Sequence, residues 1–298
     1  MNYVKDWEAT KSKFEAWWEG TNTGRPLMRV IGKNTFEIPE LIKAKTPEEH
    51  YLDADKIAAR YRLECENSTF MGEAFPNVNM DIGPGCMALY LGSEPEFFWD
   101  TVWYKEVIHD ISTYGPLEFN EENQWYMKHM AMAQTLKEAS KGDFYVGIPD
   151  IIENIDIVAA LRGSQNIIFD MMDTPDLVKC KIEEVDNLYF DYYDRYYNLL
   201  KDEDGACFTM FQIWGPGRVA KIQCDFSAMI SPNQYREFIL PSLKKQCKKL
   251  DYSLYHLDGP DAIRHLDAVM EIDELKALQW TCGAGQPDGG YEGWYEIY

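Results

Sequence analysis

The segment from Tyr255 to Pro260 places a histidine and an aspartate two residues apart. Residues at this spacing in a strand point to the same side, so His256 and Asp258 are predicted to project together. Gly259-Pro260 then ends the strand and leaves both side chains at its carboxyl tip. An imidazole beside a carboxylate can transfer protons or bind a metal ion. The alternative is a buried histidine that is held by a structural aspartate.

An amide and a thiol close the next predicted strand. Gln279 and Cys282 lie on opposite strand faces if the strand continues through them. Gln279 is a candidate for substrate binding. A Cys282 thiolate would complete a zinc site of three protein ligands with His256 and Asp258. Alternatively, Cys282 is a small packed residue beside glycine and alanine.

Further polar residues follow two other predicted strands. Asp150 comes directly after Ile148-Pro149 and precedes Asn154, so both are candidates for substrate hydrogen bonding or proton transfer. Helix capping is the competing explanation. Asp81 precedes the loop Gly83-Pro84-Gly85, where a ligand could approach the backbone, although no phosphate-binding motif is present. Stabilisation of that loop is the alternative role of Asp81.

A tryptophan and a glutamine end a fourth predicted strand. Gln212 is a candidate substrate contact, and Trp214 could stack on a flat ligand. Trp214 could equally close the core of the fold. The segment 224–227 is interpreted mainly as a turn.

Strands and helices alternate along the chain, which favours a parallel sheet with crossover connections. An accessory hairpin is predicted within 97–110. The six predicted strands are 27–31, 75–81, 144–148, 207–213, 252–257 and 277–281. Predicted helices cover 4–19, 46–67, 123–140, 174–200 and 231–250, with a short one from 261. We predict an α/β (β/α)8 TIM barrel as one domain over 1–298, with an N-terminal helical extension over 1–24. The strand count predicts that this chain lacks the last C-terminal strand-helix units.

The composition excludes several classes of partner. The 298 residues carry a net charge of −21, which disfavours binding to nucleic acid and to anionic membranes. No apolar run approaches the roughly 18 residues of a membrane span. Seven cysteines without a CxxC motif favour a reducing compartment. We therefore expect a cytoplasmic protein that acts on a small-molecule substrate.

Several segments together resemble the uroporphyrinogen decarboxylase superfamily, which includes cobalamin-dependent methyltransferases. The similarity extends over most of the chain and is clearest over 143–295. It rests on GIPDIIENIDIVAALRG, FDMMDTPDLV, QCDFSAMISPNQYREFILPSL, YHLDGPDAIRHLDAVMEIDELKALQW and CGAGQP, with a weaker match at MDIGPGCMALYLG. The resemblance implies a (β/α)8 barrel, and it places Asp81 at the position of the family's catalytic aspartate.

The resemblance implies methyl transfer between a small substrate and a corrinoid or thiol acceptor, with zinc as a metal and a corrinoid protein as a partner. Methyltransferases of this group bind zinc through His-x-Cys and a distant Cys. Here His256-x-Asp258 replaces the thiolate by a carboxylate. The resemblance also implies a homodimer.

Two other functions remain open. A cofactor-independent decarboxylase of a tetrapyrrole or another carboxylated molecule would need a basic pocket, for which Arg25, Arg29, Arg162 and Arg218 are the candidates. The arginine-rich N-terminal motif of the family's decarboxylases is absent. A non-catalytic barrel that binds a corrinoid or tetrapyrrole is the third possibility.

Overall fold

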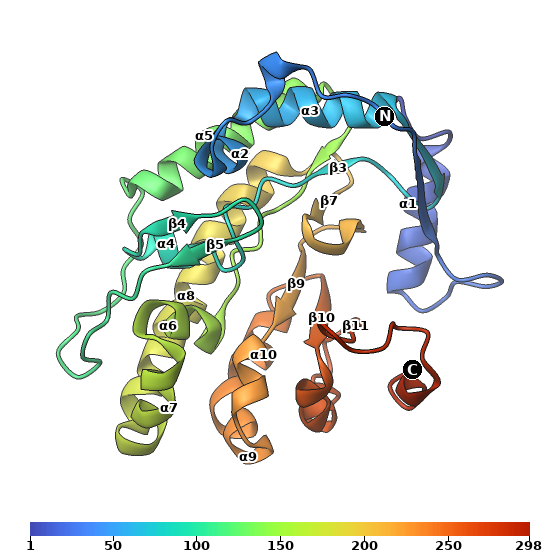
Figure 1. Ribbon diagram of the computed structural model, residues 1–298. Helices are drawn as coiled ribbons and strands as arrows, with labels where there is room; N and C mark the ends of the chain where they lie inside the picture. Colours follow the sequence, from blue (N-terminus) through green and yellow to red (C-terminus); the bar gives the residue numbers. More distant parts are fainter.

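The computed structural model describes residues 1–298 as a mixed α/β fold in which helices cover one side of a curved row of strands (Figure 1). Two groups of parallel strands form this row, β3–β6 and β9–β10–β11, and an isolated parallel bridge from Ile148 to Phe208 joins β6 to β7. Their bounds are β3 (Asn77–Val78), β6 (Tyr145–Val146), β7 (Gly205–Phe208), β9 (Val219–Gln223), β10 (Tyr252–Asp258) and β11 (Ala277–Thr281). The strands do not form a closed barrel.

The first predicted strand does not belong to this row. Residues 27–31 overlap β1 (Arg29–Lys33), which pairs antiparallel with β2 (Ser68–Gly72) in a separate two-stranded sheet. Most β1 side chains are exposed, so this strand has no face to bury against the core. The predicted accessory hairpin is confirmed as β4 (Pro95–Phe97) paired antiparallel with β5 (Val102–Tyr104).

The predicted strand 207–213 is wrong. Strand β7 ends at Phe208, and a 3-10 turn over Met210–Gln212 reverses the chain, with φ of +63° at Phe211 and +53° at Gln212. The chain returns as β8 (Ile213–Pro216), antiparallel to β7, and β9 then begins at Val219. Strand β9 was not predicted because the buried Lys221 interrupts its apolar pattern.

Helices pack against the row and against each other. The helices are α1 (Trp7–Trp18), α2 (Pro47–Leu52), α3 (Ala54–Glu66), α4 (Met87–Tyr90), α5 (Gln124–Ser140), α6 (Asn154–Arg162), α7 (Ser164–Asp173), α8 (Pro175–Leu200), α9 (Pro232–Gln234), α10 (Leu240–Cys247) and α11 (Leu266–Val269). The predicted helix 46–67 is divided at Asp53, whose side chain accepts a hydrogen bond from the backbone N–H of Lys56 and so begins α3. None of these helices could cross a membrane.

Two apolar clusters stabilise the arrangement. The larger one fills the space between the strands and helices α5, α6, α8 and α10. A second, small cluster lies near the start of β3 and β6, where helix α1 covers the strands. Its members are Phe14, Phe75, Tyr145, Cys207 and Trp214, with Trp7 packed against them. The carboxyl ends of the strands lie at the other end of the row, and they carry polar side chains.

Candidate active site

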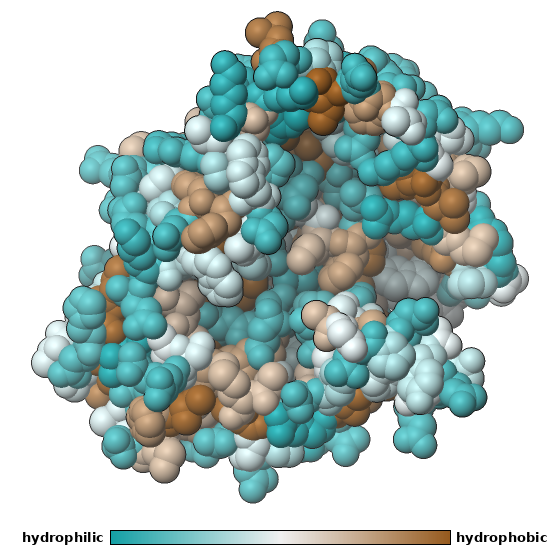
Figure 2. All heavy atoms as spheres, viewed as in Figure 1, coloured by the Kyte–Doolittle hydropathy of each residue, from teal (hydrophilic) through white to brown (hydrophobic).

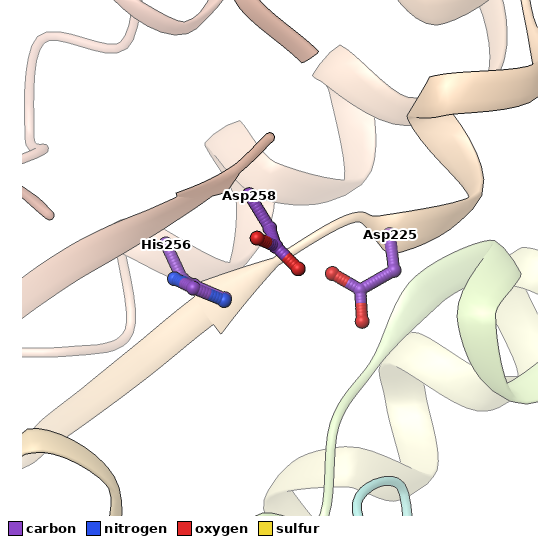
Figure 3. A group of neighbouring side chains, drawn as sticks. All are labelled: Asp225, His256 and Asp258. Atoms are coloured by element: carbon purple, nitrogen blue, oxygen red, sulfur yellow. The ribbon is translucent and has the colours of Figure 1, made fainter. Parts of the chain in front are cut away.

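Three potential metal ligands converge at the carboxyl ends of β9 and β10. The ligand atoms of Asp225, His256 and Asp258 all lie within 4.8 Å of one another. Figure 3 shows the two carboxylates facing each other, with the His256 ring directed toward the same space. Asp225 and Asp258 are exposed and His256 is half-buried, so the group is open to solvent.

Gln279 orients the His256 ring. The Gln279 amide nitrogen donates to the Trp280 carbonyl at 2.6 Å and to Thr281 Oγ1 at 2.9 Å, so its oxygen faces Nδ1 of His256. Because that oxygen can only accept, Nδ1 carries a proton, and in the neutral ring Nε2 then keeps its lone pair. A ring held in this way presents Nε2 as a ligand or proton acceptor. Gln279, predicted as a substrate contact, therefore has a positioning role.

Hydrogen bonds fix both the side chain and the backbone of Asp225. The Gln223 amide donates to Asp225 Oδ2 at 2.8 Å. The Asp156 carboxylate accepts the backbone N–H groups of Asp225 at 2.8 Å and Phe226 at 2.9 Å. Although Asp225 is exposed, partial desolvation by the protein atoms around it raises its pKa, with Asp258 and Asp150 acting in the same direction and Lys221 and His256 opposing them. A cation bound at the cluster would favour the ionised form of Asp225.

A buried chain of polar contacts links Asp225 to Asp150 and Asp81. Lys221 hydrogen-bonds Gln223 and forms an ion pair with Asp150 Oδ1 at 2.6 Å. The Asp150 backbone N–H donates to Asp81 Oδ1 at 2.7 Å. Burial opposes the charge of Lys221, but Asp150 raises its pKa above the ordinary value, so it remains a cation. Burial, together with the nearby Asp150 charge, raises the pKa of Asp81 to about 7.

Two adjacent cavities open beside these groups. A cavity of 480 Å³ is lined by Asp225, Gln223 and Asp156 together with apolar side chains, among them Ile157 and Phe226. A second cavity of 530 Å³ is lined by residues that include Asp81, Asp150 and Gln212. Pro84, Thr101 and Val102 line both cavities and so lie between them. Figure 2 shows a hollow at the centre of this face, with hydrophilic residues on its walls.

No family model matches the sequence, and no curated protein matches it. A methyltransferase from Methanosarcina mazei has a similar structure, with a TM-score of 0.62 and 13% sequence identity over 90% of this chain and 75% of that chain. The likeness shows a shared fold.

The structure brings together part of the predicted site. His256 and Asp258 lie side by side as predicted from their spacing, and Asp225 joins them in place of Cys282, which follows the end of β11 and is not in the group. Asp225 was missed because its segment was interpreted mainly as a turn. Its signal is its position, two residues after the end of β9 and at the start of the 3-10 helix Asp225–Met229.

Two residues that were predicted to contact the substrate are buried in other parts of the structure. Trp214 is fully buried in the cluster under α1, because β8 runs back toward the amino ends of the strands, and it cannot stack on a ligand at the opposite end. Asn154 is also fully buried, and its amide donates to the Gln223 carbonyl at 2.8 Å, which fixes α6 to β9.

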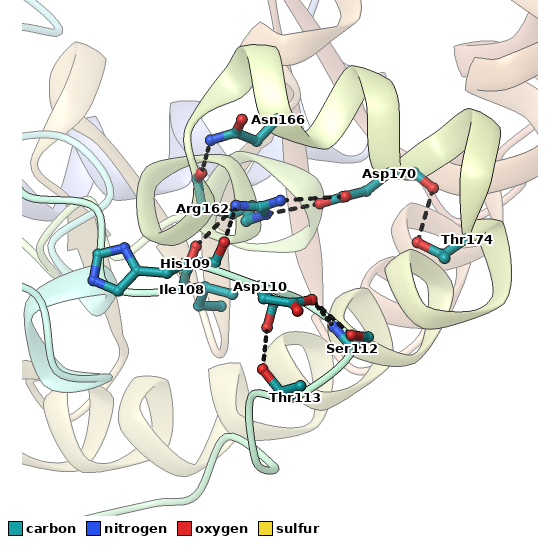
Figure 4. Close-up of polar contacts among 9 residues, drawn as sticks. All are labelled: Ile108, His109, Asp110, Ser112, Thr113, Arg162, Asn166, Asp170 and Thr174. Carbon is teal, nitrogen blue, oxygen red and sulfur yellow. Dashed lines mark hydrogen bonds and ion pairs between the residues drawn. The ribbon is translucent and has the colours of Figure 1, made fainter.

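The four candidate arginines do not form one basic pocket. Arg162 binds Asp170 and the carbonyls of Ile108 and His109, which ties α6 to α7 and to the preceding loop (Figure 4). Two others are in ion pairs elsewhere, Arg25 with Glu73 and Arg218 with Asp194. The fourth, Arg29, lines a separate cavity of 250 Å³.

Proposed function

We propose that the chain is a methyl-transfer enzyme whose small substrate lies at the carboxyl ends of β9 and β10. The acceptor is a corrinoid carried by a partner protein, or a thiol. The fold shared with a methyltransferase supports this class of reaction. The decarboxylase alternative receives no comparable support, because the four candidate arginines do not meet in one pocket.

The observation that carries the proposal is the convergence of Asp225, His256 and Asp258 beside the 480 Å³ cavity. One nitrogen and two carboxylate oxygens suit a zinc ion with three protein ligands and one open position. Zinc bound there would polarise the heteroatom that carries or accepts the methyl group. Nine of the 18 residues lining the cavity are hydrophobic, which suits a small organic substrate with few polar groups.

The protein's own residues would act by positioning. Gln279 selects the neutral His256 tautomer in which Nε2 is free to bind a ligand, and Gln223 with Asp156 fixes the Asp225 carboxylate. In the transfer, the carbon–heteroatom bond of the substrate breaks, and the heteroatom keeps the electron pair and takes up a proton. The acceptor supplies the electron pair of the new bond to carbon. Holding donor and acceptor in line is the main contribution that this geometry makes to the rate.

Metal analysis tests the cluster. We expect the purified full chain to contain stoichiometric zinc, and we expect His256→Ala and Asp225→Asn each to lose most of it. Asp267→Asn, at an exposed aspartate, is the matched control and should retain the metal. Circular dichroism checks that each variant is folded. Absence of metal from the folded wild-type protein, or full retention in both variants, would remove the metal from the proposal.

Methyl transfer is tested separately. The protein is incubated with methanol, methylamines or aryl methyl ethers and with reduced cobalamin or a thiol, and methylated product is measured. Product formation that is lost in His256→Ala supports the proposal. If cobalamin raises the unfolding temperature but no substrate turns over, the chain is instead a non-catalytic corrinoid-binding protein.

A further inference from the structure

The sheet does not hold Asp225 opposite Asp258. The parallel ladder between β9 and β10 ends at the pair of Gln223 and His256, two residues before either carboxylate. Asp225 is the first residue of the 3-10 helix Asp225–Met229, the ligand turn. The carboxylates of Asp225 and Asp258 face each other within 4.8 Å and repel each other, so other contacts must fix the ligand turn (Figure 3).

Two consecutive side chains bind the far end of the ligand turn. The guanidinium of Arg264 donates to the carbonyl of Ala228. Nε2 of His265 lies 2.9 Å from the carbonyl of Ser227. Both side chains belong to the 3-10 helix Pro260–His265, which begins two residues after the end of β10. The ligand turn is thereby tied to the strand that carries the opposite carboxylate.

Packing fixes the orientation of the His265 ring. The side chain is buried, and its ring stacks on the ring of Tyr235 at a centroid distance of 4.5 Å and an interplanar angle of 16°. The Tyr235 hydroxyl lies 2.9 Å from the hydroxyl of Tyr255, which belongs to β10. The stacked ring therefore connects β10 to the ligand turn, with Nε2 directed at the turn.

One ring nitrogen of His265 binds the ligand turn, and the other has no partner. Because a carbonyl oxygen only accepts, Nε2 carries the proton and donates to Ser227. Burial lowers the pKa of His265, so the ring is neutral at neutral pH and Nδ1 keeps a lone pair. Nδ1 is buried without a hydrogen-bond donor, which costs stability. Stability alone therefore does not explain a histidine at this position.

We infer that Arg264 and His265 are positioning residues, which clamp the ligand turn so that Asp225 faces Asp258 across the metal cluster. Neither side chain is among the proposed metal ligands. The inference rests on the proposed function, because it assigns the clamp to the proposed zinc site. The ligand turn also contributes to the wall of the 480 Å³ cavity, so the clamp shapes the substrate space as well.

His265→Phe separates positioning from a purely structural role. The substitution keeps a ring to stack on Tyr235 and removes both the donor to Ser227 and the unpartnered Nδ1. The Ser227 carbonyl still accepts the backbone N–H of Ile230 at 3.2 Å. We expect the free energy of unfolding in urea to stay unchanged or to rise. Zinc affinity, measured by competition with a chromophoric chelator, should fall about tenfold.

Rescue and control variants complete this comparison. His265→Gln loses the stacked ring but offers an amide donor to the same carbonyl, so it should recover much of the zinc affinity. His129 is also buried, and its Nε2 binds the carbonyl of Met80 at 2.8 Å, outside the metal cluster. His129→Phe should therefore leave zinc affinity unchanged. Arg264→Met should weaken zinc binding, whereas Arg236→Met, at another exposed arginine, should not.

Hydrogen exchange measures the ligand turn without any metal. In chelator-treated protein, we expect the backbone amides of 225–230 to exchange faster in His265→Phe and Arg264→Met than in the wild type, while those of β9 stay protected. Unchanged exchange in both variants would contradict the clamp. Faster exchange together with wild-type zinc affinity would also overturn the inference, because the contacts would then hold the turn without positioning the cluster.

Zinc binding by the wild type separates this inference from the proposed function. If the wild type binds zinc and both clamp variants bind it equally tightly, the inference fails and the proposed function stands. If zinc affinity falls in the clamp variants but no methyl group is transferred, the reaction is wrong and the positioning role stands. A folded wild-type protein that binds no zinc would overturn the metal site and the clamp's role in it.

Discussion

A buried lysine lies at the centre of the polar residues between the two cavities. Lys221 is 6% exposed, and its partner Asp150 is 7% exposed. Removing one member of a buried ion pair leaves the other charge without compensation, which costs about 3–5 kcal/mol. We expect Lys221→Met to lower the free energy of unfolding by that amount in urea denaturation.

The double variant Lys221→Met/Asp150→Asn is the control for this prediction. It removes both charges, so a substantial part of the lost stability should return. A loss below about 1 kcal/mol in the single variant would mean that the ion pair is not desolvated as the structure places it.

A buried glutamate makes stability depend on pH. Burial raises the pKa of Glu153 to about 8, and its Oε1 accepts the backbone N–H of Gln223 at 2.9 Å. Because the folded-state pKa lies above the ordinary value, the contribution of Glu153 to stability is complete at low pH and is lost as pH rises through about 8. Glu153→Gln keeps the shape without the ionisation. We expect it to be more stable than the wild type at alkaline pH, by up to a few kcal/mol, and to lose this advantage in mildly acidic buffer.

Thermal unfolding followed across this pH range measures the difference. Glu138→Gln, on the surface helix α5, is the control and should follow the wild-type curve. Parallel pH curves for wild type and Glu153→Gln would show that Glu153 does not titrate within the folded range.

At the scale of elements, local signals predicted those parts of the chain where sequence and packing agree. The start of α5 is capped by Asn123, and Pro175 is the first residue of α8, so both helices begin as predicted. Strand β11 matches its prediction of 277–281.

The elements that the sequence failed to predict depend on contacts between distant residues or on unusual backbone angles, which hydrophobic patterns in one sequence do not show. Strand β9 was not predicted because its central residue, Lys221, is a buried cation that is neutralised by Asp150, which lies in the loop after β6. The hairpin β7–β8 was not predicted because Phe211 and Gln212, at its turn, adopt positive φ although neither is glycine. Asp225 was missed for a related reason, since its strand was not predicted.

The N-terminal helix is expected to stabilise the fold without affecting the site. Trp18 Nε1 of α1 donates to the Trp214 carbonyl at 2.9 Å, and the Trp214 ring packs against Trp7 at a centroid distance of 6.1 Å. Truncating a fully buried tryptophan costs about 3–5 kcal/mol. We therefore expect Trp214→Ala to lower the free energy of unfolding by this amount while zinc content stays unchanged.

Trp103, which is 65% exposed on the hairpin β4–β5, is the matched tryptophan. Trp103→Ala should leave stability nearly unchanged. If Trp214→Ala reduced ligand binding in protein shown to be folded, the stacking role that was first predicted for Trp214 would regain support.

At the scale of the whole molecule, the net charge of −21 opposes compaction. Repulsion between exposed carboxylates is screened by salt over a Debye length that falls from about 30 Å at 0.01 M to about 8 Å at 0.15 M. We expect the unfolding temperature to rise by a few degrees between these ionic strengths, and differential scanning fluorimetry at constant pH measures the change. A constant or falling unfolding temperature would show that local ion pairs outweigh the overall repulsion.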